Sequence, residues 1–184
     1  IDITRYSWKT LASQEPNRYP KELFTVLEST WVFNTVEWLD HYAKRDWTLT
    51  HMDYELDNVL IDDDGPIVID WQSPMISHPG VDLAWLLAAS HTEETLAVEE
   101  DFLKLYRDTL SSSGGPSWSL EELEEALAWG ILYPVSCQAV PYLQDVSAYG
   151  EGAERMHQRF EKFLQGSIDA AVRWNLVDHL QPLI

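Results

Sequence analysis

The chain has 184 residues, of which 45% are hydrophobic, so it is long enough and apolar enough to bury one core. It carries 31 acidic and 12 basic residues, a formal net charge of -19. That charge argues against nucleic acid or an anionic membrane surface as a partner, because both are bound through basic patches. The single cysteine, Cys137, excludes an internal disulfide, and we find no long uncharged apolar run or secretory signal, so we expect a cytoplasmic protein.

The sequence pattern predicts helices within the first 44 residues. Residues 1–19 are polar and mixed, and we expect them to contain some helix. From Pro20 onward the apolar spacing is helical, and a proline suits the first position of a helix. We expect one or two helices here, with a break near residues 29–30. Their apolar face would include Leu23, Val26, Leu27, Trp31, Phe33, Trp38 and Leu39.

A β-hairpin is predicted in the middle of the chain, after a short β segment at residues 48–50. Residues 59–61 and 67–69 are apolar and largely β-branched, and the acidic stretch between them contains an Asp-Gly turn signal. An antiparallel pair of strands would bring Asn58, before the first strand, beside Asp70, after the second. Both side chains could then reach one Mg²⁺, which prefers oxygen ligands.

The next part of the chain predicts two helices. Residues 73–79 are expected to be irregular, and residues 81–89 form an apolar, buried helix. Residues 92–110 have the spacing of an amphipathic helix. The serine- and glycine-rich stretch at 111–116 is expected to be a loop.

Two further helices complete the predicted fold. Ser119 and Glu122 form a capping box that opens the first of them, and Pro134 and Pro141 should kink or end it. The last helix should run from about residue 151 to residue 177. The predicted fold class is mainly α with one small β-hairpin.

One compound pattern carries chemistry. Residues 51–58 read H-x-D-x-x-x-x-N, and Asp70 ends the second β run. Phosphoryl transfer needs one carboxylate to orient the attacking hydroxyl, together with oxygen ligands that hold Mg²⁺ on the phosphates. Asp53, Asn58 and Asp70 supply that set in chain order. Singly, such an aspartate is usually a turn residue or cap, and His51 a packing residue, so the specificity lies in the combination.

The pattern resembles the catalytic core of the aminoglycoside phosphotransferase and choline kinase family, relatives of the protein kinases. That family carries an H-G-D-x-x-x-x-N loop and an I-D-[WF] segment. The resemblance implies that Asp53 is the catalytic aspartate and that Asn58 and Asp70 bind the metal.

The resemblance continues into the following helix. Residues 80–84 read G-V-D-L-A and are similar to the G-x-D-L-A stretch of the family. There Asp82 would accept hydrogen bonds that support the catalytic loop. We interpret His51 as a structural residue of the same loop.

Two positions depart from related patterns. Met52 stands where the family usually has a small residue after the histidine. Protein kinases place a lysine two residues after the catalytic aspartate, and here that position is Glu55. A carboxylate cannot neutralise a transferring phosphate, and no Ala-Pro-Glu segment follows, so the sequence favours a small-molecule kinase over a protein kinase.

Kinases of this superfamily hold ATP between two lobes, and the N-terminal lobe carries a Gly-rich loop and a phosphate-binding lysine. Residues 1–184 contain neither signature. We therefore expect them to be the C-terminal, catalytic and acceptor-binding lobe of a protein-kinase-like α+β fold. The partner would be the protein's own N-terminal lobe, and residues 1–184 alone should be inactive. A one-lobed remnant without activity is the alternative.

The resulting hypothesis is an ATP- or GTP-dependent phosphotransferase that uses Mg²⁺ and phosphorylates a hydroxyl of a small molecule. Kinases of aminoglycosides, choline, homoserine and sugars share these motifs, so the acceptor stays open. A catalytically inactive kinase-like module that binds nucleotide or ligand is the alternative function.

Three aromatic residues are candidates for the acceptor pocket. By resemblance, the helices after the metal segment form that pocket, and an aromatic lining could hold a cation or a sugar face. Trp129, Tyr133 and Tyr142 lie in this region. Core packing is the alternative for each of them.

Overall fold

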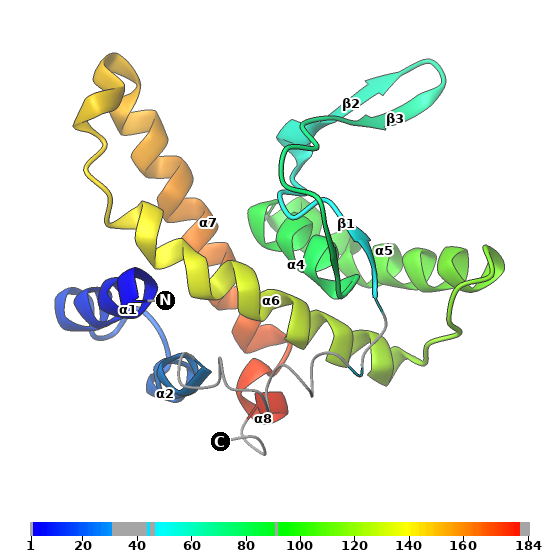
Figure 1. Cartoon of the computed structure of the whole chain (residues 1–184), viewed down its shortest axis with the longest axis horizontal. Helices are drawn as coiled ribbons and strands as arrows, with labels where there is room; N and C mark the ends of the chain where they lie inside the picture. The colour runs from blue at the N-terminus through cyan, green and yellow to red at the C-terminus, as the bar shows by residue number, and fades with distance from the viewer. Residues whose placement is uncertain (1, 31–43, 45–46, 91, 181–184) are drawn as a thin grey trace.

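The computed structural model describes residues 2–30, 44, 47–90 and 92–180, with the helices and strands shown in Figure 1. The expected apolar positions Trp31, Phe33, Trp38 and Leu39 lie outside the described residues. The described helices are α1 Asp2–Gln14, α2 Lys21–Thr30, α4 Gly80–Ala89, α5 Glu93–Ser112, α6 Leu120–Tyr142, α7 Ala153–Arg173 and α8 Leu176–Leu180, with short 3-10 turns at Leu56–Asn58 and Ser147–Gly152.

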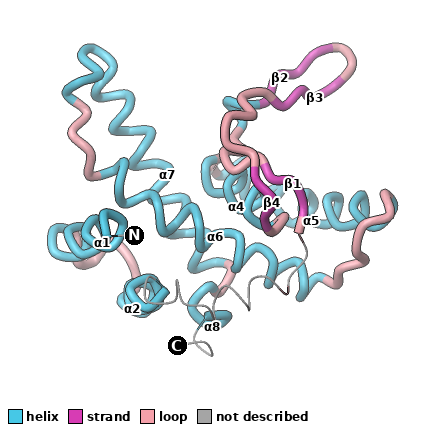
Figure 2. The backbone as a smooth tube through the Cα atoms, in the orientation of Figure 1, coloured by secondary structure: helices cyan, strands magenta, loops and turns pink. Residues whose placement is uncertain are grey.

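The predicted hairpin is confirmed. Strand β2 (Val59–Asp62) pairs antiparallel with β3 (Gly65–Val68), and Figure 2 shows the pair projecting away from the helices. The turn between them is tight, because Asp62 pairs directly with Gly65. The Asp62 carboxylate accepts hydrogen bonds from the backbone N–H groups of Asp64 (2.9 Å) and Gly65 (3.1 Å). Gly65 has φ 122°, a conformation that favours glycine.

The expectation of a single small hairpin was incomplete, because the structure contains a second two-stranded sheet. Strand β1 (Thr48–Thr50) pairs antiparallel with β4 (Met75–Ser77), which lies in the stretch expected to be irregular. The Thr50 hydroxyl adds a hydrogen bond to the Met75 carbonyl at 2.9 Å. A three-residue strand is too short to show an alternating pattern, and only its partner far along the chain defines it.

The helices after residue 80 largely follow their sequence signals. α5 begins after Thr92, and α6 begins with the predicted capping box, in which Ser119 and Glu122 exchange backbone and side-chain hydrogen bonds. α5 extends to Ser112, so the following loop starts later than expected.

The helix ends differ in part from expectation. α6 ends at Tyr142, one residue after Pro141, as expected, but Pro134 does not end it. Pro134 is buried, and core packing on both sides of it holds the helix where the proline removes a hydrogen bond. The last helix is split into α7 and α8 at Asn175, whose φ of 53° is left-handed.

The core lies around α6, which crosses the molecule and contacts α4, α7, α1 and α8 (Figure 1). Buried apolar side chains from these helices and from α2 form one continuous cluster. Its fully buried large members include Trp8, Leu11, Leu23, Leu27, Leu127, Ile131, Leu164, Ile168 and Leu176. None of the described helices is both long and apolar enough to cross a membrane.

The crossing of α4 and α6 depends on two glycines. A Cβ atom on Gly80 would lie 2.0 Å from the backbone oxygen of Ala126. A Cβ on Gly130 would lie 1.9 Å from the backbone oxygen of Gly80. The two backbones therefore touch where α4 begins, and only glycine permits this approach.

We predict that Gly130→Ala lowers the free energy of unfolding by at least about 3 kcal/mol, because the clash involves backbone and no side chain can move to relieve it. Gly152→Ala is the control, since nothing lies within 4 Å of a Cβ atom there. Its effect should stay within about 0.5 kcal/mol. Denaturant unfolding measures both, and equal stabilities of the two variants would contradict the tight crossing.

Candidate functional site

The loop at residues 51–58 is held to α4 by one carboxylate. Asp82, in the first turn of α4, accepts a hydrogen bond from the His51 backbone N–H at 2.7 Å and from the Met52 backbone N–H at 2.9 Å. Both oxygens of Asp82 are thus used by neighbouring amides. The positive end of the helix also favours a negative charge in this position.

His51 connects the loop to the segment that carries Asp70. Its side chain is buried, and its Nε2 lies 2.8 Å from the Ile69 backbone oxygen. A carbonyl only accepts, so Nε2 carries the proton. The imidazole also packs edge-on against the Trp71 ring, with centroids 4.7 Å apart. These contacts give His51 a structural place in the loop.

Asn58 closes the loop through its amide nitrogen. The Asn58 Nδ2 donates to the Asp53 backbone oxygen at 2.8 Å, and the Glu55 backbone N–H donates to the same oxygen at 3.1 Å. Asn58 is 9% exposed. No described group donates a hydrogen bond to its Oδ1, which is therefore available to another ligand. In the described part of the chain, the Asp53 carboxylate accepts no hydrogen bond.

Asp70 follows the hairpin directly. The Ile69 backbone N–H donates to the Asn58 backbone oxygen at 2.9 Å, which extends the strand pairing by one residue. Asp70 itself has φ 62°, and its carbonyl accepts from the Gln72 N–H at 2.8 Å. The hairpin therefore places Asp70 directly after Ile69, the residue whose backbone is hydrogen-bonded to Asn58.

The chemistry of this donor set fits a hard cation, since an amide oxygen and exposed carboxylate oxygens are ligands that Mg²⁺ prefers. Among the described residues, no group of three or more His, Cys, Asp or Glu side chains forms a complete metal site. A Mg²⁺ ion held by one or two protein ligands takes its remaining ligands from phosphates and water.

Glu55 and Asp57 of the loop contact α7. The guanidinium of Arg159 forms an ion pair with Glu55 and a second one with Asp57 at 3.4 Å. Burial raises the pKa of the Glu55 carboxyl, and the Arg159 charge opposes that rise. Sequence reasoning missed Arg159, because it lies 104 residues from Glu55 and carries no local motif.

A cavity of about 340 Å³ lies beside this ion-pair cluster. The loop, the α4–α5 junction and α7 form its walls. Its polar lining includes Glu55, Asp57, Ser90, Thr92, Arg159 and Lys162.

The aromatic candidates lie in different surroundings. Trp129 is 2% exposed within the core, where the packing alternative accounts for it. Tyr133 is 44% exposed and lies against Trp85, with ring centroids 5.7 Å apart. The pKa of Tyr133 is raised by burial first and then by the charges of Cys137 and Asp53. The Tyr133 hydroxyl therefore lies within electrostatic range of Asp53.

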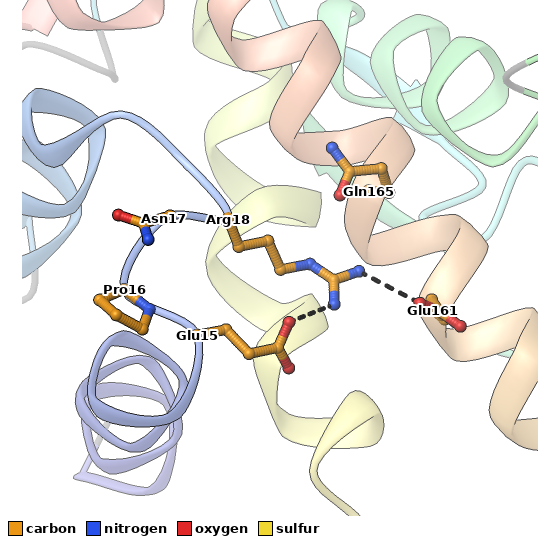
Figure 3. Close-up of a pocket in the computed structure, with 6 residues that line it drawn as sticks. All are labelled: Glu15, Pro16, Asn17, Arg18, Glu161 and Gln165. Carbon is orange, nitrogen blue, oxygen red and sulfur yellow. Dashed lines mark hydrogen bonds and ion pairs between the residues drawn. The ribbon is translucent and has the colours of Figure 1, made fainter.

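Tyr142 belongs to another region. Its hydroxyl donates to Glu15 at 2.7 Å and accepts from Arg18 at 3.0 Å. Figure 3 shows Arg18 between Glu15 and Glu161, to which it pairs at 2.7 and 3.9 Å. Glu15, Arg18 and Glu161 line a second cavity of about 460 Å³, and no residue of the 51–58 loop lines it. Tyr142 thus connects α6 to the segment after α1.

Comparison with known proteins gives one match. The model of a family described as the phosphotransferase enzyme family matches residues 2–119, well over half of the chain. This chain belongs to that family. The match confirms the resemblance to aminoglycoside phosphotransferases, and it contains the whole segment from His51 to Asp82, whereas α6, α7 and α8 lie beyond it. No curated protein and no solved structure matches the chain significantly.

Met52 occupies a strained position in the loop at residues 51–58. Its φ is 69°, and its side chain is buried. A left-handed conformation costs a non-glycine residue about 1 kcal/mol or more. That cost explains why a small residue suits this position in related loops. Here the burial of the methionine side chain offsets it.

We predict that Met52→Gly is more stable than Met52→Ala by about 1 kcal/mol, because both lose the buried side chain and only glycine removes the backbone strain. Both variants should be less stable than the wild type. Thermal and denaturant unfolding of the three proteins measure the order. An alanine variant as stable as the glycine variant would contradict the strain at Met52.

Proposed function

We propose that this phosphotransferase is a small-molecule kinase, which transfers the γ-phosphoryl group of ATP or GTP to a hydroxyl of a small acceptor. One observation carries the proposal: Asp53, Asn58 and Asp70 lie on a single loop-hairpin unit and keep side-chain oxygens that the described fold does not use. Membership of a phosphotransferase family also supports phosphoryl transfer.

Each residue has a role in this proposal. Asp53 orients the acceptor hydroxyl and receives its proton. Asn58 and Asp70 hold Mg²⁺, which neutralises charge on the phosphates. His51 and Asp82 fix the loop that carries Asp53, and they touch neither nucleotide nor acceptor.

Tyr133 is the aromatic candidate best suited to the acceptor, because it is partly exposed and its hydroxyl senses the charge of Asp53. A phenol can stack on a sugar face or donate a hydrogen bond to it. The proposed acceptor is the class that the sequence indicates, a low-molecular-weight alcohol such as an aminoglycoside, choline or a sugar.

The sheet surfaces support a further, nucleotide-gripping lobe as partner of the described residues. Leu49 and Ile76 are opposite each other on β1 and β4, and both are exposed. Leu60 and Ile67 are opposite each other on β2 and β3, and both are exposed as well. Paired apolar side chains of this kind are typical of a surface that another unit covers. We propose that this unit is the N-terminal lobe, and that residues 1–184 alone do not turn over nucleotide.

We predict that Asp53→Ala and Asp70→Ala fail in different ways in the complete protein. Asp53→Ala should reduce turnover about 10²–10⁴-fold with little change in nucleotide affinity, because Asp53 faces the acceptor. Asp70→Ala should also weaken Mg²⁺-dependent nucleotide binding. ADP release with a panel of hydroxyl acceptors and nucleotide titration measure the two effects.

Asp63→Ala is the control for both variants, because Asp63 is an exposed residue of the hairpin turn. It should retain wild-type turnover and affinity. Most of the activity remaining in Asp53→Ala would contradict the assignment. Mg²⁺-dependent nucleotide binding without transfer to any acceptor would favour the inactive binding module.

A further inference from the structure

We propose that Arg159 is a positioning residue of this phosphotransferase, which fixes the catalytic loop by bridging Glu55 and Asp57. The inference rests on the proposed function, since it is the role of Asp53 and Asn58 that makes this loop catalytic. Arg159 itself touches neither of them in the described contacts. It would act by holding the segment that joins them.

The contacts of that segment identify Arg159 as its outer anchor. Within the loop, the Glu55 N–H donates to the Asp53 oxygen at 3.1 Å and the Asn58 N–H donates to the Glu55 oxygen at 2.9 Å. Among the hydrogen bonds and ion pairs of the described residues, Arg159 alone reaches residues 54–57 from another helix. Without it, the segment would depend on its own short-range bonds.

Glu55 is the buried end of this bridge, whereas Asp57 is an exposed partner, 76% exposed. The side chain of Glu55 is only 14% exposed, whereas that of Arg159 is 47% exposed. A largely buried carboxylate needs a charged partner, because removal of the partner leaves it poorly solvated. The planar guanidinium can donate to two carboxylates at once, which a lysine ammonium does with less geometric precision.

The helix that carries Arg159 packs against α4. Four residues later on α7, Phe163 packs edge-on against Trp85 of α4, with ring centroids 5.1 Å apart. α4 is the helix whose Asp82 holds the first two amides of the loop. The loop is therefore held at its start by α4 and at its middle by α7, and these two helices pack against each other.

This anchor is not part of the matched family region, which ends at residue 119. Arg159 lies on α7, beyond it. Its partner Glu55 occupies the position where protein kinases have a lysine. The arrangement therefore supplies a positive charge to this part of the loop from a distant helix.

Amide hydrogen exchange of the loop tests the inference without requiring phosphoryl transfer. In Arg159→Gln, the amides of residues 53–58 should exchange about 3- to 10-fold faster than in the wild type, which corresponds to the loss of a bridge of this exposure. Exchange in the rest of α7 should stay unchanged. Arg159→Lys should restore part of the protection, because it keeps the charge and loses the fork.

Arg173→Gln is the matched control, because Arg173 is also on α7 and bridges a mostly buried acid, Glu99, at 2.7 Å. It should leave the exchange of residues 53–58 unchanged. In the double variant Glu55→Gln/Arg159→Gln, the acceleration of amide exchange in residues 53–58 should be smaller than the product of the accelerations in the two single variants. The reason is that the two residues act through the same ion pair.

Unchanged loop exchange in Arg159→Gln, or equal acceleration along all of α7, would overturn the inference. In a preparation that transfers phosphate, Arg159→Gln should lower kcat about 10-fold and leave KM for MgATP within about twofold, because loop geometry and not nucleotide contact is lost. A wild type that transfers no phosphate would overturn the proposed function and leave the exchange result to decide the role of Arg159.

Discussion

The site depends on the two hydrogen bonds that Asp82 accepts from the backbone of the loop at residues 51–58. Charge-assisted bonds to neighbouring buried amides fix the direction of the chain at His51 and Met52, and loss of the carboxylate would leave these amides unpaired. Asp82 can reach them because α4 begins in backbone contact with α6, where Gly80 and Gly130 lack side chains. The packing of α4 against α6 in the core thus determines where Asp82 lies, and Asp82 in turn fixes the position of the loop.

The contact of the loop with α7 places the Glu55 carboxylate in a partly buried position, which disfavours its charged form. The pKa of Glu55 in the folded state is raised above its unfolded value, mainly by burial. The contribution of this group to stability is therefore full below the unfolded pKa and falls as the pH rises through the folded pKa. At neutral pH the ionised carboxylate opposes folding even beside Arg159. Acids with a perturbed pKa are frequent at functional sites.

The sequence predicted those parts of the molecule that local patterns determine. The loop pattern, the hairpin with its Asp-Gly turn and the capping box at Ser119 are all short-range signals. β4, the continuation of α6 through Pro134 and the ion pair of Arg159 depend on partners distant in the sequence. No periodicity or propensity encodes such partners. Of the three aromatic candidates, Trp129 is buried in the core and Tyr142 bonds to other residues, whereas Tyr133 is partly exposed. Burial and side-chain contacts are tertiary properties, which the local pattern does not encode.

The central claim is that Asn58 and Asp70 hold the Mg²⁺ of a bound nucleotide next to Asp53. A crystal structure of the protein with Mg²⁺ and a non-hydrolysable ATP analogue tests it most directly. We predict one ion about 2.1 Å from a side-chain oxygen of each of these two residues, with phosphate oxygens among its other ligands. A nucleotide bound with its metal away from both residues would contradict the account.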